Sequence, residues 1–193
     1  MKLIKPIVDY INSTLQTGKL NGVYWQSGKW FGVCSTTAGV DEDGNVEYFV
    51  HENGNDVTPD DTYPVTVYHR CTGVQFVPIQ SQFGTGSSLL KARYNMRAVV
   101  FVDTEKIKIE ANDLAFLFYA GFPDEIKRSL FTIDGIAKCT VTATSAETDT
   151  AKLFQGEFAA PYAGQLASSV LIAVNYVIEI DADRHCLACQ DCT

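Results

Sequence analysis

The sequence predicts an α+β fold, with a mostly antiparallel β-sheet covered on one side by helices. Two long stretches, Leu89 to Asp103 and Ser168 to Asp181, carry apolar residues at every second position, which predicts strands with one buried face. Two other stretches repeat apolar residues at helical spacing and predict an N-terminal helix and a second, broken helix. Runs of strands separated by single helices are typical of α+β domains.

Composition agrees with an ordinary globular protein. The chain has 193 residues, 46% of them hydrophobic, and a formal net charge of −8. This length allows one domain, residues 1–193, with a real core. An acidic chain is not expected to be a dedicated nucleic-acid binder, because clustered Lys and Arg supply phosphate affinity. No stretch approaches the length of a membrane span, so we expect no membrane partner.

The first helix is expected from Leu3 to Leu15, where one apolar stripe repeats at spacings of three and four. Its members are Ile4, Ile7, Val8, Ile11 and Leu15. A hairpin is expected next, from Gly22 to Cys34, with Trp25 and Trp30 near its turn. Such a pair closes a hairpin or a subunit contact, or it stacks on a ligand.

Residues 36–61 form the acidic part of the chain. Two glycine-containing turns flank a short expected strand from Val46 to His51. The acids Asp41 and Asp43 lack the spacing of a calcium loop. We expect a projecting acidic loop or arm, long enough to reach a neighbouring subunit.

Three strands follow. Tyr63 to Cys71 and Val74 to Ile79 predict two short strands, and residues 80–88 predict a loop. In the long strand from Leu89 to Asp103, the face opposite the apolar one carries three cations, at Lys91, Arg93 and Arg97. Three interpretations are open: a solvated sheet face, a surface that meets the acidic arm of a neighbouring subunit, or a surface that faces DNA.

Asn112 to Phe131 predicts a helix in two pieces. The first begins at Asn112 as cap and ends at Gly121. The second, residues 124–131, follows Pro123 and has acids first and bases later, as the helix dipole favours. A strand from Gly135 to Ser145 and a connector over residues 148–165 come next.

The strand from Ser168 to Asp181 is longer than the usual strand of about 5–6 residues. Its apolar face belongs to the core. The other face carries Leu171, Ala173 and Val177, which have no obvious cover within the chain. We therefore expect these three residues at a subunit interface.

The six cysteines fall into two groups. Those at 34, 71 and 139 lie singly in expected strands and are interpreted as buried, inert thiols. The other three, Cys186, Cys189 and Cys192, follow His185 in the C-terminal tail, residues 182–193. Their spacing is compatible with a metal site, a disulfide or a plain exposed tail. The N-terminus lacks a signal-peptide pattern, so we expect a cytosolic origin with reduced cysteines. We also expect that the protein binds no cofactor.

No motif for hydrolytic, nucleotide-dependent or metal-dependent catalysis occurs in the sequence, and we expect that the protein is not an enzyme. Two alternatives remain for test. One is a small-molecule or glycan-binding module that uses Trp25 and Trp30. The other is an enzyme whose carboxylates come together only in the fold.

The layout of the chain resembles the tail-terminator, tail-completion and neck-ring proteins of tailed bacteriophages. Within these, it is similar to proteins of the crAss-like phages of Bacteroidetes. Three segments carry the likeness: KPIVDYINSTLQ, NDLAFLFYAGFPDEIKRSL and NYVIEIDADRHCLACQDC. The resemblance implies a virion structural protein without catalysis. It implies a ring, a hexamer or dodecamer of this chain, around the genomic DNA channel at the head–tail junction or tail end. Its further partners would be portal, neck or tail proteins.

Overall fold

The computed structural model describes residues 3–17, 27–40, 42–44, 46–78, 89–127, 136–157 and 167–183. Their strands form one mixed sheet in the order β3-β2-β1-β4-β5-β7-β6, in which β1 and β4 run parallel and all other neighbours are antiparallel. The strands are β1 (Lys29–Val40), β2 (Val46–Glu52), β3 (Asn55–Asp56), β4 (Val65–Pro78), β5 (Leu89–Asp103), β6 (Ile136–Glu147) and β7 (Ser169–Asp183). The helices are α1 (Ile4–Thr17), α2 (Ala111–Gly121) and α3 (Thr150–Glu157). The expected α+β class is confirmed.

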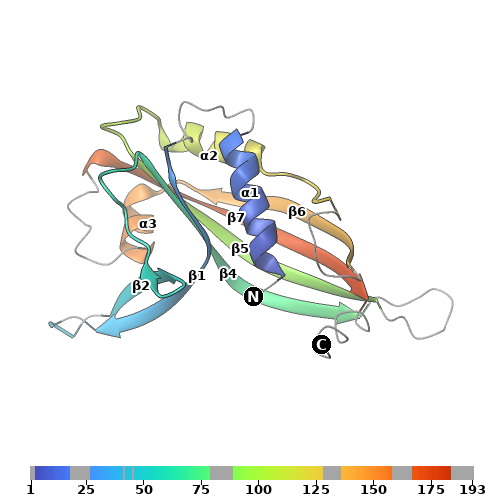
Figure 1. Cartoon of the computed structure of the whole chain (residues 1–193). Helices are drawn as coiled ribbons and strands as arrows, with labels where there is room; N and C mark the ends of the chain where they lie inside the picture. The colour runs from blue at the N-terminus through green and yellow to red at the C-terminus, as the bar shows by residue number, and fades with distance from the viewer. Residues whose placement is uncertain are drawn as a thin grey trace.

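Two helices cover the first face of the sheet (Figure 1). The predicted apolar stripe of α1 is fully buried there, and α2 adds Leu114, Ala115 and Phe118 to the same cluster. The apolar sides of β4, β5, β6 and β7 complete this main core. Burial of the stripe explains why α1 forms where its apolar spacing predicts it.

A buried polar chain ties α1 to the sheet. Asn12 donates through Nδ2 to the Phe31 carbonyl at 2.9 Å, which leaves its Oδ1 to accept from His69 Nε2 at 2.7 Å. His69 Nδ1 is therefore unprotonated and accepts from the Tyr176 hydroxyl at 2.9 Å. Burial lowers the pKa of His69 to about 3, so the imidazole is neutral at physiological pH.

The third helix, α3, covers part of the opposite face. Its Leu153 and Phe154 pack with Val99 and Phe101 of β5 and with Leu171 and Ala173 of β7. The sequence interpretation treated residues 148–165 as a connector, because one eight-residue helix shows too few repeats for a helical period. This helix therefore covers part of β7.

The predicted second helical piece, residues 124–131, is wrong for its described part, residues 124–127. These residues run beside β6 instead. The Ile126 amide donates to the Cys139 carbonyl at 3.1 Å, and the Val141 amide donates to the Asp124 carbonyl at 3.0 Å. Helix α2 also begins two residues earlier than expected, with Glu110 rather than Asn112 at its N-cap and no side-chain cap bond.

Two bulges explain the remaining strand differences. β4 is one strand where the sequence predicted two, because a register shift between Cys71 and Gly73 absorbs the apparent break. In β6 a shift between Ile136 and Lys138 turns Ile136 to the same buried side as Cys139 and Val141. Strict alternation along the strand would place Ile136 on the other face.

The expected acidic loop is a β-hairpin. The second half of β1 pairs with β2 from Ser35↔His51 to Val40↔Val46, and β3 extends the hairpin after a turn at Asn53 and Gly54, both at positive φ. We call residues 35–56 the arm. Figure 1 shows the arm splayed away from the rest of the sheet. Four segments with predictions from the sequence lie outside the described residues. They are residues 22–26 of the expected hairpin, with Trp25, the loop 80–88, residues 128–131 and tail residues 184–193.

Candidate assembly surfaces

The outer part of the arm has no cover on either face within the described structure. Four consecutive residues of β1, Ser35 to Ala38, are exposed, although neighbouring side chains of a strand point to opposite faces. Val40 and Val46 are 70% and 60% exposed, and Phe49 is also at the surface. A two-stranded ribbon without further packing is only marginally stable in water. The arm therefore has the properties of a segment that is completed by a partner.

The base of the arm, in contrast, is well fixed to the body. The Glu52 carboxylate accepts from the Gly32 amide at 2.6 Å, and the Val57 amide donates to the Val50 carbonyl at 2.7 Å. His51 lies 2.7 Å from the Asp56 carboxylate and 2.8 Å from the Thr37 hydroxyl. The bond between Glu52 and Gly32 ties the base of the arm to the body, whereas the contacts of His51 hold the strands of the arm to one another.

A second uncovered surface lies on β4. Its pairing with β1 ends at Cys34↔Arg70, and no described strand pairs with β4 on that side beyond this point. We call residues 72–78 the open half of β4. Phe76 is 61% exposed, Val74 and Val77 are also at the surface, and the segment contains no charged residue. It combines a bare sheet edge with apolar side chains, a combination that favours strand pairing with another chain.

The predicted cationic strip on β5 divides into two parts. Lys91 Nζ lies 3.4 Å from both Glu179 and Asp181 of β7, and Arg93 is exposed opposite Glu179. These two cations lie at the surface beside the open half of β4, since Lys91 pairs in register with Val77 and Arg93 with Gln75. Acids of β7 interleave with them, so the strip is not a continuous basic patch of the kind that DNA binding uses.

Arg97, the third cation, belongs to an internal ion network rather than to the surface. Its guanidinium bridges Glu147 and Glu157 at 3.0 Å each. Burial acts to lower the pKa of Arg97, but its bonds to these two carboxylates outweigh burial and raise the pKa. Glu157 is only 4% exposed and also binds Arg70 at 2.7 Å and the Tyr68 hydroxyl at 2.9 Å. The network holds the end of α3 on the sheet.

The expectation that Leu171, Ala173 and Val177 lack cover within the chain is wrong. Leu171 and Ala173 are 0% exposed beneath Leu153 and Phe154 of α3, and Val177 is 8% exposed. The sequence did not predict this cover, because it comes from α3, which lies within the residues 148–165 that were expected to be a connector. These three residues are therefore not exposed for a subunit contact.

No protein-family model matches the chain, and no curated protein is significantly similar to it. The geometry of the surfaces carries the functional argument.

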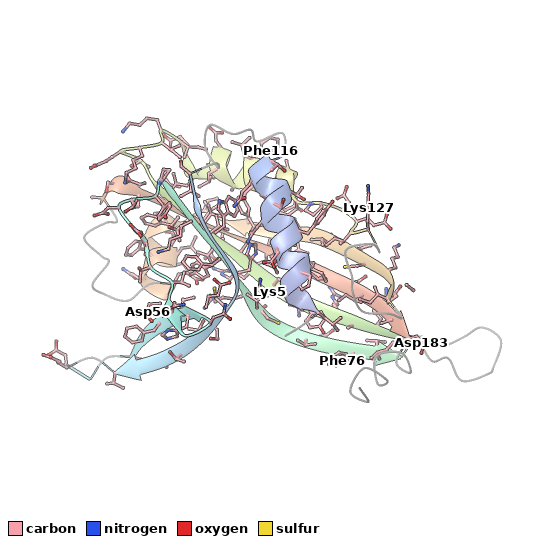
Figure 2. All side chains as sticks on the ribbon, in the orientation of Figure 1. Lys5, Asp56, Phe76, Phe116, Lys127 and Asp183 are labelled. Atoms are coloured by element: carbon pink, nitrogen blue, oxygen red, sulfur yellow. The ribbon has the colours of Figure 1, made fainter. Side chains whose placement is uncertain are left out.

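A third apolar surface lies on the outer side of α2. Phe116, labelled at the top of Figure 2, is 72% exposed. It borders a cleft of about 680 Å³ whose lining includes Ile109, Leu117 and Val170, with Lys108 and Asp113 among the charged residues. The charges around this cleft are of both signs and do not select one kind of ligand.

Of the two tryptophans considered for ligand binding, the structure describes only Trp30. Trp30 is half-buried and packs against the main core, and Trp25 lies outside the described residues. Cys34 and Cys139 are buried as predicted, and burial raises the pKa of each thiol to about 12, so both are unreactive. In the described part of the chain no group of three or more His, Cys, Asp or Glu residues is placed to hold a metal ion. No described helix is long and apolar enough to cross a membrane.

Proposed function

We propose that this chain is a structural subunit that assembles with copies of itself into a closed ring. The observation that carries the proposal is the arm, a two-stranded ribbon that is fixed at its base and bare on both faces along its outer part. Such a ribbon gains little from its own chain and gains stability when a neighbour covers it.

The place of the arm supports a ring over a symmetric dimer. The arm and the open half of β4 are different surfaces on different parts of the molecule, as Asp56 and Phe76 mark in Figure 2. A contact between unlike surfaces repeats from copy to copy, and it closes into a ring when the rotation between copies permits.

From the resemblance in layout to tailed-phage ring proteins, we propose that such a ring belongs to a tailed-phage particle, at the head–tail junction or the tail end. Six or twelve copies would surround the DNA channel, between portal, neck or tail proteins. The mixed charge of the Lys91 and Arg93 strip supports subunit contacts in this setting more than tight DNA binding.

The small-molecule or glycan-binding alternative has less support, because Trp30 packs against the core. An enzyme with a fold-assembled carboxylate site also has less support. Its best buried acid, Glu157, is neutralised by Arg70 and Arg97.

The native mass of the full chain tests the proposal. Light scattering after size exclusion should give a single multiple of the 21.2 kDa chain, and negative-stain images should show a ring with a central opening. A chain that stays monomeric at its highest attainable concentration would refute assembly. Mass spectrometry of purified virions from the source of the gene tests the location separately.

A further inference from the structure

We infer that the arm of one copy lies against the open half of β4 of the next copy, an inference that rests on the proposed assembly. Each copy then gives one arm and receives one. The occupant of the open half of β4 is thus a second copy of this chain.

The two surfaces match in chemistry. The outer arm exposes Val40, Val46 and Phe49, and its tip carries the exposed acids Glu42 and Asp43. The open half of β4 exposes Val74, Phe76 and Val77, and the neighbouring strand carries the cations Lys91 and Arg93. Apolar side chains therefore meet apolar side chains, and the acids of the arm tip face the exposed Arg93, while Lys91 is shared with Glu179 and Asp181 of its own chain.

The two surfaces do not meet within one chain. β1 and β4 pair in parallel as far as Cys34↔Arg70 and then separate. From that point the arm and the open half of β4 continue in different directions. Figure 1 shows the two ends diverging, and Figure 2 places Asp56 of the arm well apart from Phe76. Contact between them therefore requires two copies.

The backbone supports the same pairing. Among the described strands, none pairs with the open half of β4 on its β1 side, and none pairs with the outer edge of β1 beyond Cys34, which is the arrangement that strand addition uses. The β6 edge of the sheet, in contrast, is covered by other residues of the chain. Residues 124–126 pair along β6, and the Tyr119 hydroxyl donates to the Ala143 carbonyl at 2.8 Å. Within the described residues, the β6 edge of the sheet is thus covered and the edge along the open half of β4 is not.

Two complementary variants of the full chain test the contact. The arm variant carries Val40→Asp and Val46→Asp, and the acceptor variant carries Phe76→Asp and Val77→Asp. All four positions are exposed, so both variants should keep the circular dichroism spectrum and melting temperature of the parent. Each alone should need about 100-fold higher concentration to assemble, since each loses two apolar contacts.

Mixing the two variants gives the decisive measurement. An intact arm from the acceptor variant can enter the intact β4 surface of the arm variant, but no further copy can add. An equal mixture should therefore stop at a heterodimer, which native mass spectrometry detects by the masses of the two chains. The control variant is Phe116→Asp on α2, which should assemble as the parent does.

The outcomes separate this contact from the proposed function. If the parent assembles and the acceptor variant assembles equally well, the arm–β4 contact is wrong while assembly stands. A mixture without heterodimers, or loss of assembly only in the Phe116→Asp control, would also overturn the contact. A monomeric parent would overturn the proposed function itself.

Discussion

β7 and β1 are both long strands, with 15 and 12 residues, yet the rest of the chain covers them very differently. β7 lies between β5 and β6, and Leu171 to Val174 are fully buried on both of its faces. The second half of β1 is bare on both faces. Length alone is therefore no sign of a subunit contact; the sign is a strand that its own chain leaves uncovered.

The reason for the difference is where the helices lie. β7 pairs with β5 along its whole length, from Leu89↔Asp183 to Asp103↔Ser169, and helices pack on both sides of this region. Beyond Cys34, β1 keeps only β2 as a neighbour among the described strands. Substitutions in the body should therefore change stability, and substitutions in the arm should change assembly.

The largest effect is expected at Glu157, the buried last residue of α3. Glu157→Gln leaves the charges of Arg70 and Arg97 without their buried carboxylate, and should lower the free energy of unfolding by about 3–5 kcal/mol in urea titrations. The control is Glu147→Gln, at a more exposed partner of Arg97, which should cost less than about 1 kcal/mol. Equal losses in the two variants would show that burial of the network does not matter.

The next effect separates β7 from the arm directly. Leu171→Ala opens a cavity under α3 and should lower the free energy of unfolding by about 2–5 kcal/mol. Val46→Ala in the arm should change it by no more than about 0.5 kcal/mol, while raising the concentration needed for assembly. The comparison fails if Leu171→Ala is neutral for stability and instead weakens assembly.

The elements that the sequence predicts well are those with long, regular periods. The stripe of α1 and the strand from Leu89 to Asp103 agree with the structure because many residues repeat the same spacing. The failures have local physical causes. α3 is too short to show a period, residues 124–126 pair with β6 against their helical charge pattern, and the bulge in β6 reverses the side on which Ile136 lies.

The candidate surfaces were only partly predictable. A projecting acidic segment was expected, and its sequence from Ser35 to Val40 lacks the alternation of a half-buried strand, which is the signal of its exposure. The roles of Lys91, Arg93 and Arg97 could not be separated, because the acids that neutralise Arg97 come from residues 50 and 60 positions away. The open half of β4 depends on where β1 leaves it, which no local pattern reveals.

A smaller effect, on pH dependence, concerns the attachment of α1 to the body. Burial holds the pKa of His69 at about 3 in the folded chain, against a usual 6.5 when unfolded. Between these values the unfolded chain binds a proton that the folded chain does not, so stability falls as pH falls below about 6, by about 1.4 kcal/mol per pH unit. Unfolding of the parent and of His69→Gln at several pH values measures the difference in slope. Parallel slopes would contradict this account, since carboxylates titrate in both proteins and cancel.

The smallest effect is expected at Glu179. This residue lies on the sheet face that α3 covers, but at the end of that face near the open half of β4. Glu179 and Asp181 hold Lys91 at 3.4 Å with all three side chains a quarter to a third or more exposed, so Glu179→Gln should cost less than about 1 kcal/mol of unfolding free energy. The same substitution type at Glu157, which is buried between the end of α3 and this sheet face, is expected to cost several times more. Salt sharpens the contrast, because about 1 M NaCl screens the exposed pair far more than the buried network. A loss at Glu179 as large as that at Glu157 would mean that this end of the face is also covered, and that Lys91 and Arg93 are not available to a neighbouring arm.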